Sequence, residues 1–313
     1  MTGFQRPLRQ PNPPGRARPA MSFETPKLLF QYVLDAYSQQ IPIMIGLALL
    51  FTVLTAFKSQ QASPGKVWWR NPGLFTDISY ALIHTLIHPY FKLPALIIAT
   101  NILLGAMPED QVKTYFAEGR GPLSGLPFYW QVAFYVIVSD FLFYWIHRIF
   151  HNGTMWRFHA IHHSAREVDW TTTFRIHPIN VILQPAAVTV FMMMLGIAPS
   201  VMLFTVPFDI LTAAWVHSNL KWDLGPLKYV IAGPVFHRWH HGLPGDGGDM
   251  NFAPTFALWD YLFGTFYMPE GRIPENFGTD DDHFPEGYFS QLIYPFQKKP
   301  EEAGAVPKIV AAE

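Results

Sequence analysis

Eight histidines in two short segments constrain this chain more than any other feature of its sequence. Residues 147–163 read HRIFHNGTMWRFHAIHH, and residues 237–241 read HRWHH. On an α-helix, residues three or four positions apart lie on the same side. The spacings H-x-x-x-H, H-x-x-H-H and again H-x-x-H-H therefore predict three helix faces lined with imidazoles.

Imidazole is the commonest side-chain ligand of transition metals. A lone histidine is usually a hydrogen-bonded structural residue, but independent structural histidines would rarely repeat one spacing. Eight imidazoles also exceed what one tetrahedral ion can use, so the pattern predicts two metal ions. The predicted ligands in these segments are His147, His151, His159, His162, His163, His237, His240 and His241.

Three residues outside the segments join the predicted site. His177 precedes Pro178 and His217 ends an apolar block, so we expect both at the level of the metal-bearing helices. Asp140 lies almost two helical turns before His147 in an apolar stretch, where a carboxylate is costly and usually functional. We predict that Asp140 acts indirectly in catalysis, by accepting a hydrogen bond from a ligand imidazole.

A further pair, His84 and His88, is also spaced by four residues, within ALIHTLIHPY. This pair lacks neighbouring arginine and acidic residues of the kind that orient metal ligands. We interpret it as structural. Metal ligation and a bis-imidazole haem site are the alternatives.

The composition indicates a membrane protein. Of the 313 residues, 50% are hydrophobic and 14% are charged, whereas soluble domains carry about 25% charged residues. The net charge of −1 argues against nucleic-acid binding. The chain has no cysteine, which excludes disulfides, iron–sulfur clusters and thiol catalysis. Apolar segments are expected at 41–57, 74–107, 127–150 and 178–216, the last as a helical hairpin.

These features predict an all-α, multi-span membrane protein, with a histidine-rich di-metal site capped by a cytoplasmic helical region. We expect a disordered, basic, proline-rich tail at 1–21, a single membrane-embedded domain at 22–295, and a C-terminal tail at 296–313. Whether residues 41–57 cross the bilayer or re-enter it stays open. The excess of arginine near the histidines predicts that the site lies on the cytoplasmic face. We expect a bacterial inner membrane rather than the endoplasmic reticulum.

The three motifs resemble those of the membrane-bound fatty acid hydroxylase / sterol desaturase superfamily. Their context is also similar, with DFLFYWIHR at 140–148, Asn251, and LWDYLFGTF at 258–266. The resemblance covers roughly residues 70–295. It implies a non-haem centre of two iron ions, with zinc as a substitute. Such a centre uses dioxygen to hydroxylate or desaturate a C–H bond of a lipid, of the sterol, fatty acyl, alkylglycerol or carotenoid type.

No flavin or nicotinamide motif is present, so electrons are expected from a separate donor protein or reductase. The predicted docking surface for this donor consists of Arg148, Arg157, Arg166 and Arg238. Two other functions fit the histidines. One is a membrane di-zinc hydrolase, and the other is a non-enzymatic metal transporter. Metal analysis distinguishes the three functions. Iron together with oxygen-dependent activity indicates the oxygenase, tightly bound zinc indicates the hydrolase, and weak, exchangeable metal binding indicates the transporter.

Overall fold

A computed structural model describes residues 40–84, 108–243, 245–281 and 283–297, with scattered residues from 27 to 38 and from 98 to 105. Within these ranges the chain is helical and forms two isolated β-bridges but no β-strand. The predicted all-α fold class is therefore confirmed. The tail predicted at 1–21, His88 and most of the tail at 296–313 lie outside the described residues, as does much of the apolar stretch at 74–107.

The helices are α2 (Gln40–Ala56), α4 (Glu109–Glu118), α5 (Phe128–Phe150), α6 (Gly153–His163), α7 (Pro178–Leu195), α8 (Pro199–Phe204), α9 (Val206–His217), α10 (Pro234–His240), α11 (Leu258–Leu262) and α12 (Tyr288–Ile293). Connections are short from α4 to α6 and from α7 to α9, and longer around α10, α11 and α12. Short 3-10 helices are η1 (Lys58–Gln60), η2 (Trp68–Arg70), η3 (Trp170–Phe174), η4 (Gly225–Tyr229) and η5 (Tyr294–Phe296). Residues 74–84 are also helical.

Three helical stretches are long and apolar enough to cross a membrane: Phe128–Phe150, Pro178–Leu195 and Pro199–His217. Helix α5 is about 34 Å long at about 1.5 Å per residue, and the hydrocarbon core of a bilayer is about 30 Å thick. The prediction of several membrane-spanning helices is confirmed. Helix α2 is apolar but has only 17 residues, so its crossing stays a prediction.

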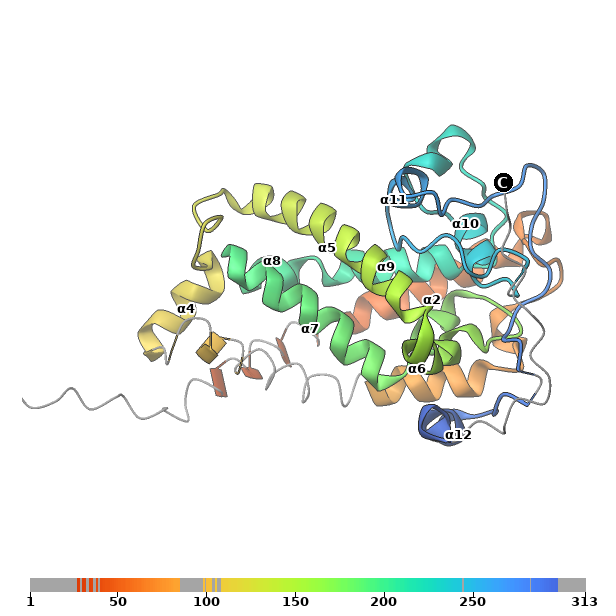
Figure 1. Ribbon diagram of the computed structural model, residues 1–313, viewed down its shortest axis with the longest axis horizontal. Helices are drawn as coiled ribbons and strands as arrows, with labels where there is room; N and C mark the ends of the chain where they lie inside the picture. The colour runs from red at the N-terminus through yellow and green to blue at the C-terminus, as the bar shows by residue number, and fades with distance from the viewer. Residues whose placement is uncertain are drawn as a thin grey trace, which may run out of the picture.

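The apolar block at 178–216 folds back on itself, as predicted. Helix α7 begins at Pro178, whose fixed φ suits a first turn, and ends at Gly196 with a left-handed φ of 87°. Helices α8 and α9 then return toward the start of α7. Figure 1 shows α5, α7 and α9 along the long axis of the molecule, with α4 at one end and α10, α11 and α12 at the other.

Two apolar clusters hold these helices together. The first joins α5, α7 and α8 through buried side chains that include Tyr135, Met192 and Val201. The second joins α2, η3 and α9, and in it the rings of Phe51 and Trp170 stack with centroids 6.2 Å apart. Because η3 directly follows the second histidine motif, this second cluster anchors the histidine-bearing end of the molecule.

Gly196 is the residue on which the hairpin turn depends. Its φ is left-handed, and a Cβ atom there would lie 2.6 Å from the Cα of Gly121. We predict that Gly196→Ala lowers the free energy of unfolding by about 2–4 kcal/mol, through backbone strain and overpacking. Thermal unfolding in detergent measures this. Gly125→Ala is the matched control, because nothing lies within 4 Å of its Cβ position. Equal stability of both variants would contradict the prediction.

Candidate metal centre

Nine histidines converge at one end of the long helices and form two groups. The first group consists of His147, His151, His159, His163 and His240, and the second of His162, His217, His237 and His241. In each group, one nitrogen from every ring lies within 4.8 Å of the others. The arrangement therefore brings together all eight histidines of the motifs and His217. It offers two separate sets of donors, the number that two metal ions require.

Each H-x-x-H-H motif contributes to both groups. In the motif on α6, His159 and His163 belong to the first group and His162 belongs to the second. In the motif on α10, His237 and His241 belong to the second group and His240 belongs to the first. Residues four apart differ by about 40° around a helix, whereas the middle residue is turned by about 100° from the last one. The spacing thus aims one short helix at two neighbouring sites.

The geometry of the second group fits a bound cation. The Nε2 atoms of His162, His237 and His241 each lie 3.1 Å from Nε2 of His217. Nδ1–H of His217 donates to the Ala213 carbonyl at 2.7 Å, and Nδ1–H of His162 donates to the Arg175 carbonyl at 3.2 Å. Their Nε2 atoms therefore carry lone pairs that face each other and repel. A cation between them removes that repulsion.

The first group fits a metal in the same way. His159 Nε2 lies 2.9 Å from His147 Nε2 and 3.3 Å from His163 Nε2. Two imidazole nitrogens bound to one ion at about 2.0–2.1 Å are about 2.9–3.4 Å apart. The Nε2 atoms of His151 and His240 are buried without a hydrogen-bond partner. Buried polar atoms are seldom left unpaired, so these two are suited to bind a metal.

The electrostatics keep these imidazoles neutral, as metal ligands must be. Burial is the main cause that lowers the pKa of the histidines outside the apolar spans, and neighbouring imidazoles lower it further in most of them. These are His151, His159, His162, His163, His237, His240 and His241. At His151, Asp249 partly opposes the effect of burial on the pKa. Lone pairs are therefore available at neutral pH.

The chain from 250 to 260 holds the first group from outside. Its carbonyl groups accept from the ligands, Phe252 O from His147 Nδ1–H at 2.6 Å and Met250 O from His240 Nδ1–H at 2.8 Å. Asp260, fully buried, accepts from the backbone N–H groups of Phe252 and Ala253 at 2.7 and 2.8 Å. Burial raises the pKa of Asp260 to about 6. The sequence reasoning missed Asp260, although its position within LWDYLFGTF was a signal.

The prediction that Asp140 bonds directly to a ligand imidazole is wrong. Its carboxylate accepts from the backbone N–H of Phe256 at 3.0 Å and from the Trp259 indole N–H at 2.9 Å. Asp140 lies two turns from His147 on α5, and the 252–259 segment packs between them and takes both interactions. Asp140 therefore lies one contact further from the histidine groups than predicted, bonded to the segment whose Phe252 carbonyl accepts from His147.

A second buried network holds the chain after the α6 motif. Arg175 donates Nε–H to Asp77 at 2.6 Å, and Thr171 donates its hydroxyl to Asp77 at 2.8 Å. Asp169 accepts from Thr171 N–H at 2.8 Å and from the Asn71 amide at 2.5 Å. Since the Arg175 carbonyl accepts from His162, this network positions a ligand of the second group. Sequence reasoning missed it, because its members are scattered among ordinary polar residues.

His177 lies outside both groups. Its Nδ1 accepts from the backbone N–H of Ile179 at 3.1 Å and caps α7, and its Nε2–H donates to the Leu292 carbonyl at 3.2 Å. Both ring nitrogens are thus engaged, and no lone pair is left for a metal. His84 also belongs to neither group.

One of the four arginines assigned to a docking surface does not belong there. Arg238 is fully buried and donates to the Val168 carbonyl at 2.8 Å and to the Ser63 hydroxyl at 2.6 Å. The prediction for Arg238 is therefore wrong. All residues of α10 are buried, so the residues beside its histidines, Arg238 included, contribute to the packing of the helix. Arg166, in contrast, is exposed.

Comparison with known proteins identifies the family. The model of the fatty acid hydroxylase family matches residues 132–265, which include all nine clustered histidines, Asp140 and Asp260. This stretch of the chain is therefore similar to a fatty acid hydroxylase domain, as the histidine motifs predicted. It is 28% identical over 251 residues to ornithine lipid hydroxylase OlsE of Rhizobium tropici, covering 78% of this chain and 73% of that protein.

Two further relatives align with a smaller part of this chain. Alkylglycerol monooxygenase of Xenopus tropicalis is 36% identical over 47% of this chain and 32% of its own length. Methylsterol monooxygenase 2-2 of Arabidopsis thaliana is 28% identical over 43% of this chain and 52% of its own length. No solved structure matches. These relatives are named as hydroxylases and monooxygenases, which confirms the expected class of oxidoreductases that use dioxygen and a metal.

The Asp260 carboxylate provides a test of the support for the first group. In Asp260→Asn, an amide N–H₂ replaces one oxygen and faces a backbone N–H that then has no acceptor. We expect the free energy of unfolding to fall by about 1–3 kcal/mol, and metal affinity to fall about 10–100-fold. Thermal unfolding and metal retention against a chelator measure both.

The matched control for this variant is Asp223→Asn. Asp223 is exposed and accepts from the Gly225 backbone N–H at 3.0 Å. We expect it to retain metal and stability. Unchanged metal retention in Asp260→Asn would show that the 250–260 segment does not position His147.

Proposed function

We propose that this protein is a membrane-bound, dioxygen-dependent hydroxylase of a lipid C–H bond. The observation that carries the proposal is the convergence of nine neutral imidazoles in two donor groups, at the end of helices able to cross a membrane. The three relatives compared above are named for an ornithine lipid, an alkylglycerol and a methylsterol. All three are amphipathic lipids.

The proposed ligands are the nine clustered histidines, and the proposed metals are two iron ions. Imidazole binds both zinc and iron, but zinc has no redox chemistry. When bound, the iron pair supplies dioxygen activation. The overall reaction is R–H + O₂ + 2 e⁻ + 2 H⁺ → R–OH + H₂O, so two electrons must come from a separate donor. The protein contributes neutral donors, carbonyl groups that fix the tautomers of four of the ligands, and a site without bulk water. These four ligands are His147, His162, His217 and His240.

Within this proposal, His177 is not a ligand, and Asp140 and Asp260 are positioning residues. Residues 22–295 form one domain in the proposal, because the family match and all clustered histidines lie inside this range. The exposed Arg166 and the half-buried Arg148 and Arg157 remain candidates for contacts with the donor.

A pair of histidines tests the ligand set. His177 and His217 are both buried, His177 at the start of the apolar helix α7 and His217 at the end of the apolar helix α9, but only His217 belongs to a donor group. We predict that His217→Ala binds one iron per chain instead of two and loses turnover, whereas His177→Ala keeps two. Elemental analysis of protein prepared with added iron measures this. Two irons in His217→Ala, or two tightly bound zinc ions in an active wild-type protein, would contradict the proposal.

A labelling experiment tests the proposed topology, with the site on the cytoplasmic face. Lys221 and Glu118 are exposed and lie at opposite ends of the long helices. In this cysteine-free chain, Lys221→Cys should react with an impermeant maleimide only from the cytoplasmic side, and Glu118→Cys only from the other side. Oriented vesicles provide the assay. Labelling of both from one side would contradict the spans.

A further inference from the structure

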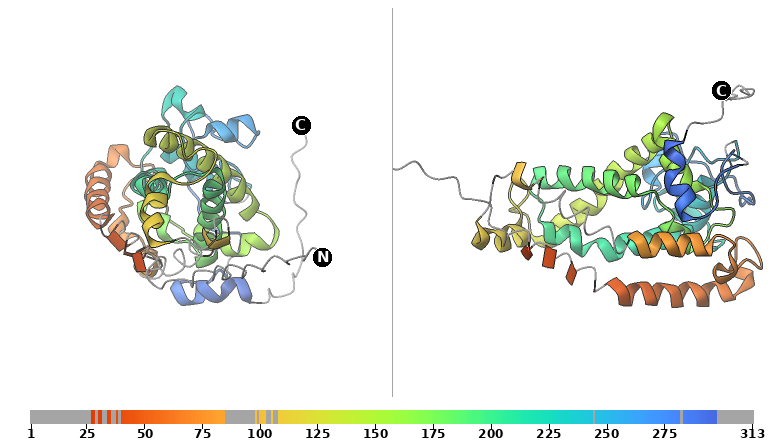
Figure 2. Two further views of the ribbon diagram at one scale, coloured as in Figure 1. Left: turned by 90° about the vertical axis from the view of Figure 1, so that its left-hand side faces the viewer. Right: turned by 90° about the horizontal axis from the view of Figure 1, so that it is seen from below.

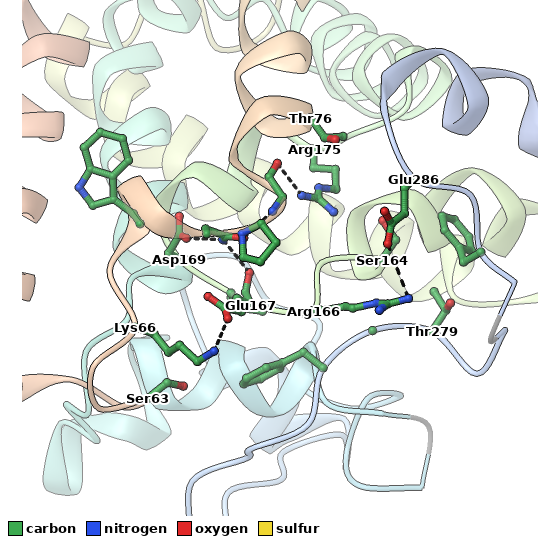
Figure 3. Close-up of a pocket in the computed structure, with 18 of the residues that line it drawn as sticks. Ser63, Lys66, Thr76, Ser164, Arg166, Glu167, Asp169, Arg175, Thr279 and Glu286 are labelled. Atoms are coloured by element: carbon green, nitrogen blue, oxygen red, sulfur yellow. Dashed lines mark hydrogen bonds and ion pairs between the residues drawn. The ribbon is translucent and has the colours of Figure 1, made fainter.

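A pocket of about 720 Å³ lies beside the metal centre (Figure 3). Its walls come from the 63–76 segment, from the chain that follows the α6 motif, and from the 275–291 segment that includes α12. Pockets of this size hold small molecules or the polar part of larger ones. No residue of the two histidine groups lines it.

The pocket nevertheless shares its wall with the metal site. Ser164, Asn219 and Leu243 line it, and each lies one or two residues after a proposed ligand, His163, His217 and His241 respectively. Arg175 also lines the pocket, and its carbonyl accepts from His162 at 3.2 Å. The chain segments that form this wall therefore also carry proposed ligands of both histidine groups.

Helix α12 places the pocket at the level of the membrane surface. Figures 1 and 2 show α12 lying crosswise to α5, α7 and α9, at the end of the molecule where the histidines lie. His177, which caps the start of α7, donates to Leu292 of α12. One face of α12 and η5 exposes Phe289, Ile293 and Phe296, at 78, 54 and 67%. An amphipathic segment in this orientation lies in the interface of a bilayer.

The charges around the pocket are of both signs. Lys66 pairs with Glu167, and Arg166 pairs with Glu286 at 3.8 Å. Figure 3 shows the two pairs on different sides of the pocket. The side chains of Arg166 and Glu286 are 77 and 84% exposed, and such exposed pairs contribute little to stability. They can therefore exchange partners with a ligand at small cost. In contrast, Arg175 and Asp77 form a buried and rigid pair.

We propose that this pocket binds the polar headgroup of the lipid substrate, and that this headgroup carries both an ammonium and a carboxylate or phosphate group. The inference rests on the proposed function, because it takes the ligand to be the substrate. The location at the membrane surface favours a lipid headgroup as the ligand. The wall shared with the histidines places that lipid near the proposed metals. The paired charges of both signs favour a zwitterionic headgroup. Cations Lys66 and Arg166 hold the anionic group, and Glu286 holds the ammonium.

Binding of three soluble lipid analogues to the protein as purified, in detergent and without dioxygen or an electron donor, tests this inference. Nα-octanoyl-ornithine carries both charges, Nα-octanoyl-norvaline lacks the ammonium, and Nα-octanoyl-ornithine methyl ester lacks the carboxylate. Isothermal titration calorimetry should show the first binding about tenfold more tightly than either of the others. Equal dissociation constants for the three would overturn the proposal, because they would indicate partition of the acyl chain alone.

One double variant tests which cations bind the anionic group of the ligand, and a second double variant is its control. Lys66→Ala with Arg166→Ala should weaken Nα-octanoyl-ornithine and Nα-octanoyl-norvaline about tenfold and leave the methyl ester unchanged. The matched control is Lys113→Ala with Arg120→Ala, which removes two exposed cations at the far end of the long helices. An unchanged dissociation constant in the Lys66 and Arg166 variant would overturn the proposal. Slower reduction by the electron donor with unchanged analogue binding would assign the pocket to the donor instead, and would also overturn it.

Because binding is measured without dioxygen or turnover, its outcome is independent of the proposed reaction. Product formation from a zwitterionic lipid and from an uncharged alkylglycerol, each in detergent with dioxygen and an electron donor, gives the second measurement. Tight zwitterion binding without any dioxygen-dependent product would contradict the proposed function alone. Turnover of lipid without preference for a zwitterion would contradict the headgroup site alone.

Discussion

The structure depends on one constraint: nine imidazole rings have lone pairs that converge in two small volumes. Neutral nitrogens held about 3 Å apart repel one another unless a cation lies between them, so the surrounding chain has to hold each ring in a single tautomer and orientation. Carbonyl groups from α9, from the loop after α6 and from the 250–260 segment do this. The buried carboxylates of Asp260 and Asp77 in turn fix those segments.

This constraint also explains why the long and the short helices have different roles. The long apolar helices α5, α7 and α9 bring distant parts of the sequence to one end of the molecule, and the short helices α6 and α10 carry most of the donors. Each H-x-x-H-H motif serves both groups, so neither group can form without α6 and α10 packed face to face. The proposed metals therefore stabilise the tertiary structure as well as supplying chemistry.

The surroundings of the site are organised by the membrane surface. The apolar faces that remain exposed on α12 and η5 lie beside the start of α7, while the mixed charges of Lys66, Glu167, Arg166 and Glu286 surround a pocket on the same side. A lipid substrate has the same two parts, an acyl chain and a polar headgroup. The proposed headgroup pocket binds the polar part of such a lipid beside the two histidine groups.

Hydrophobic runs and histidine spacing were sufficient to predict the helical class, the hairpin at 178–216 and eight of the nine clustered histidines, because helical periodicity is a local property of sequence. His217 followed from its place at the end of an apolar block. The tertiary structure alone decided which histidines group together, that His177 caps α7 and bonds to α12, and that Asp140 acts through the 252–259 segment. These outcomes depend on how segments a hundred residues apart pack, and no local pattern encodes which buried donor meets which acceptor.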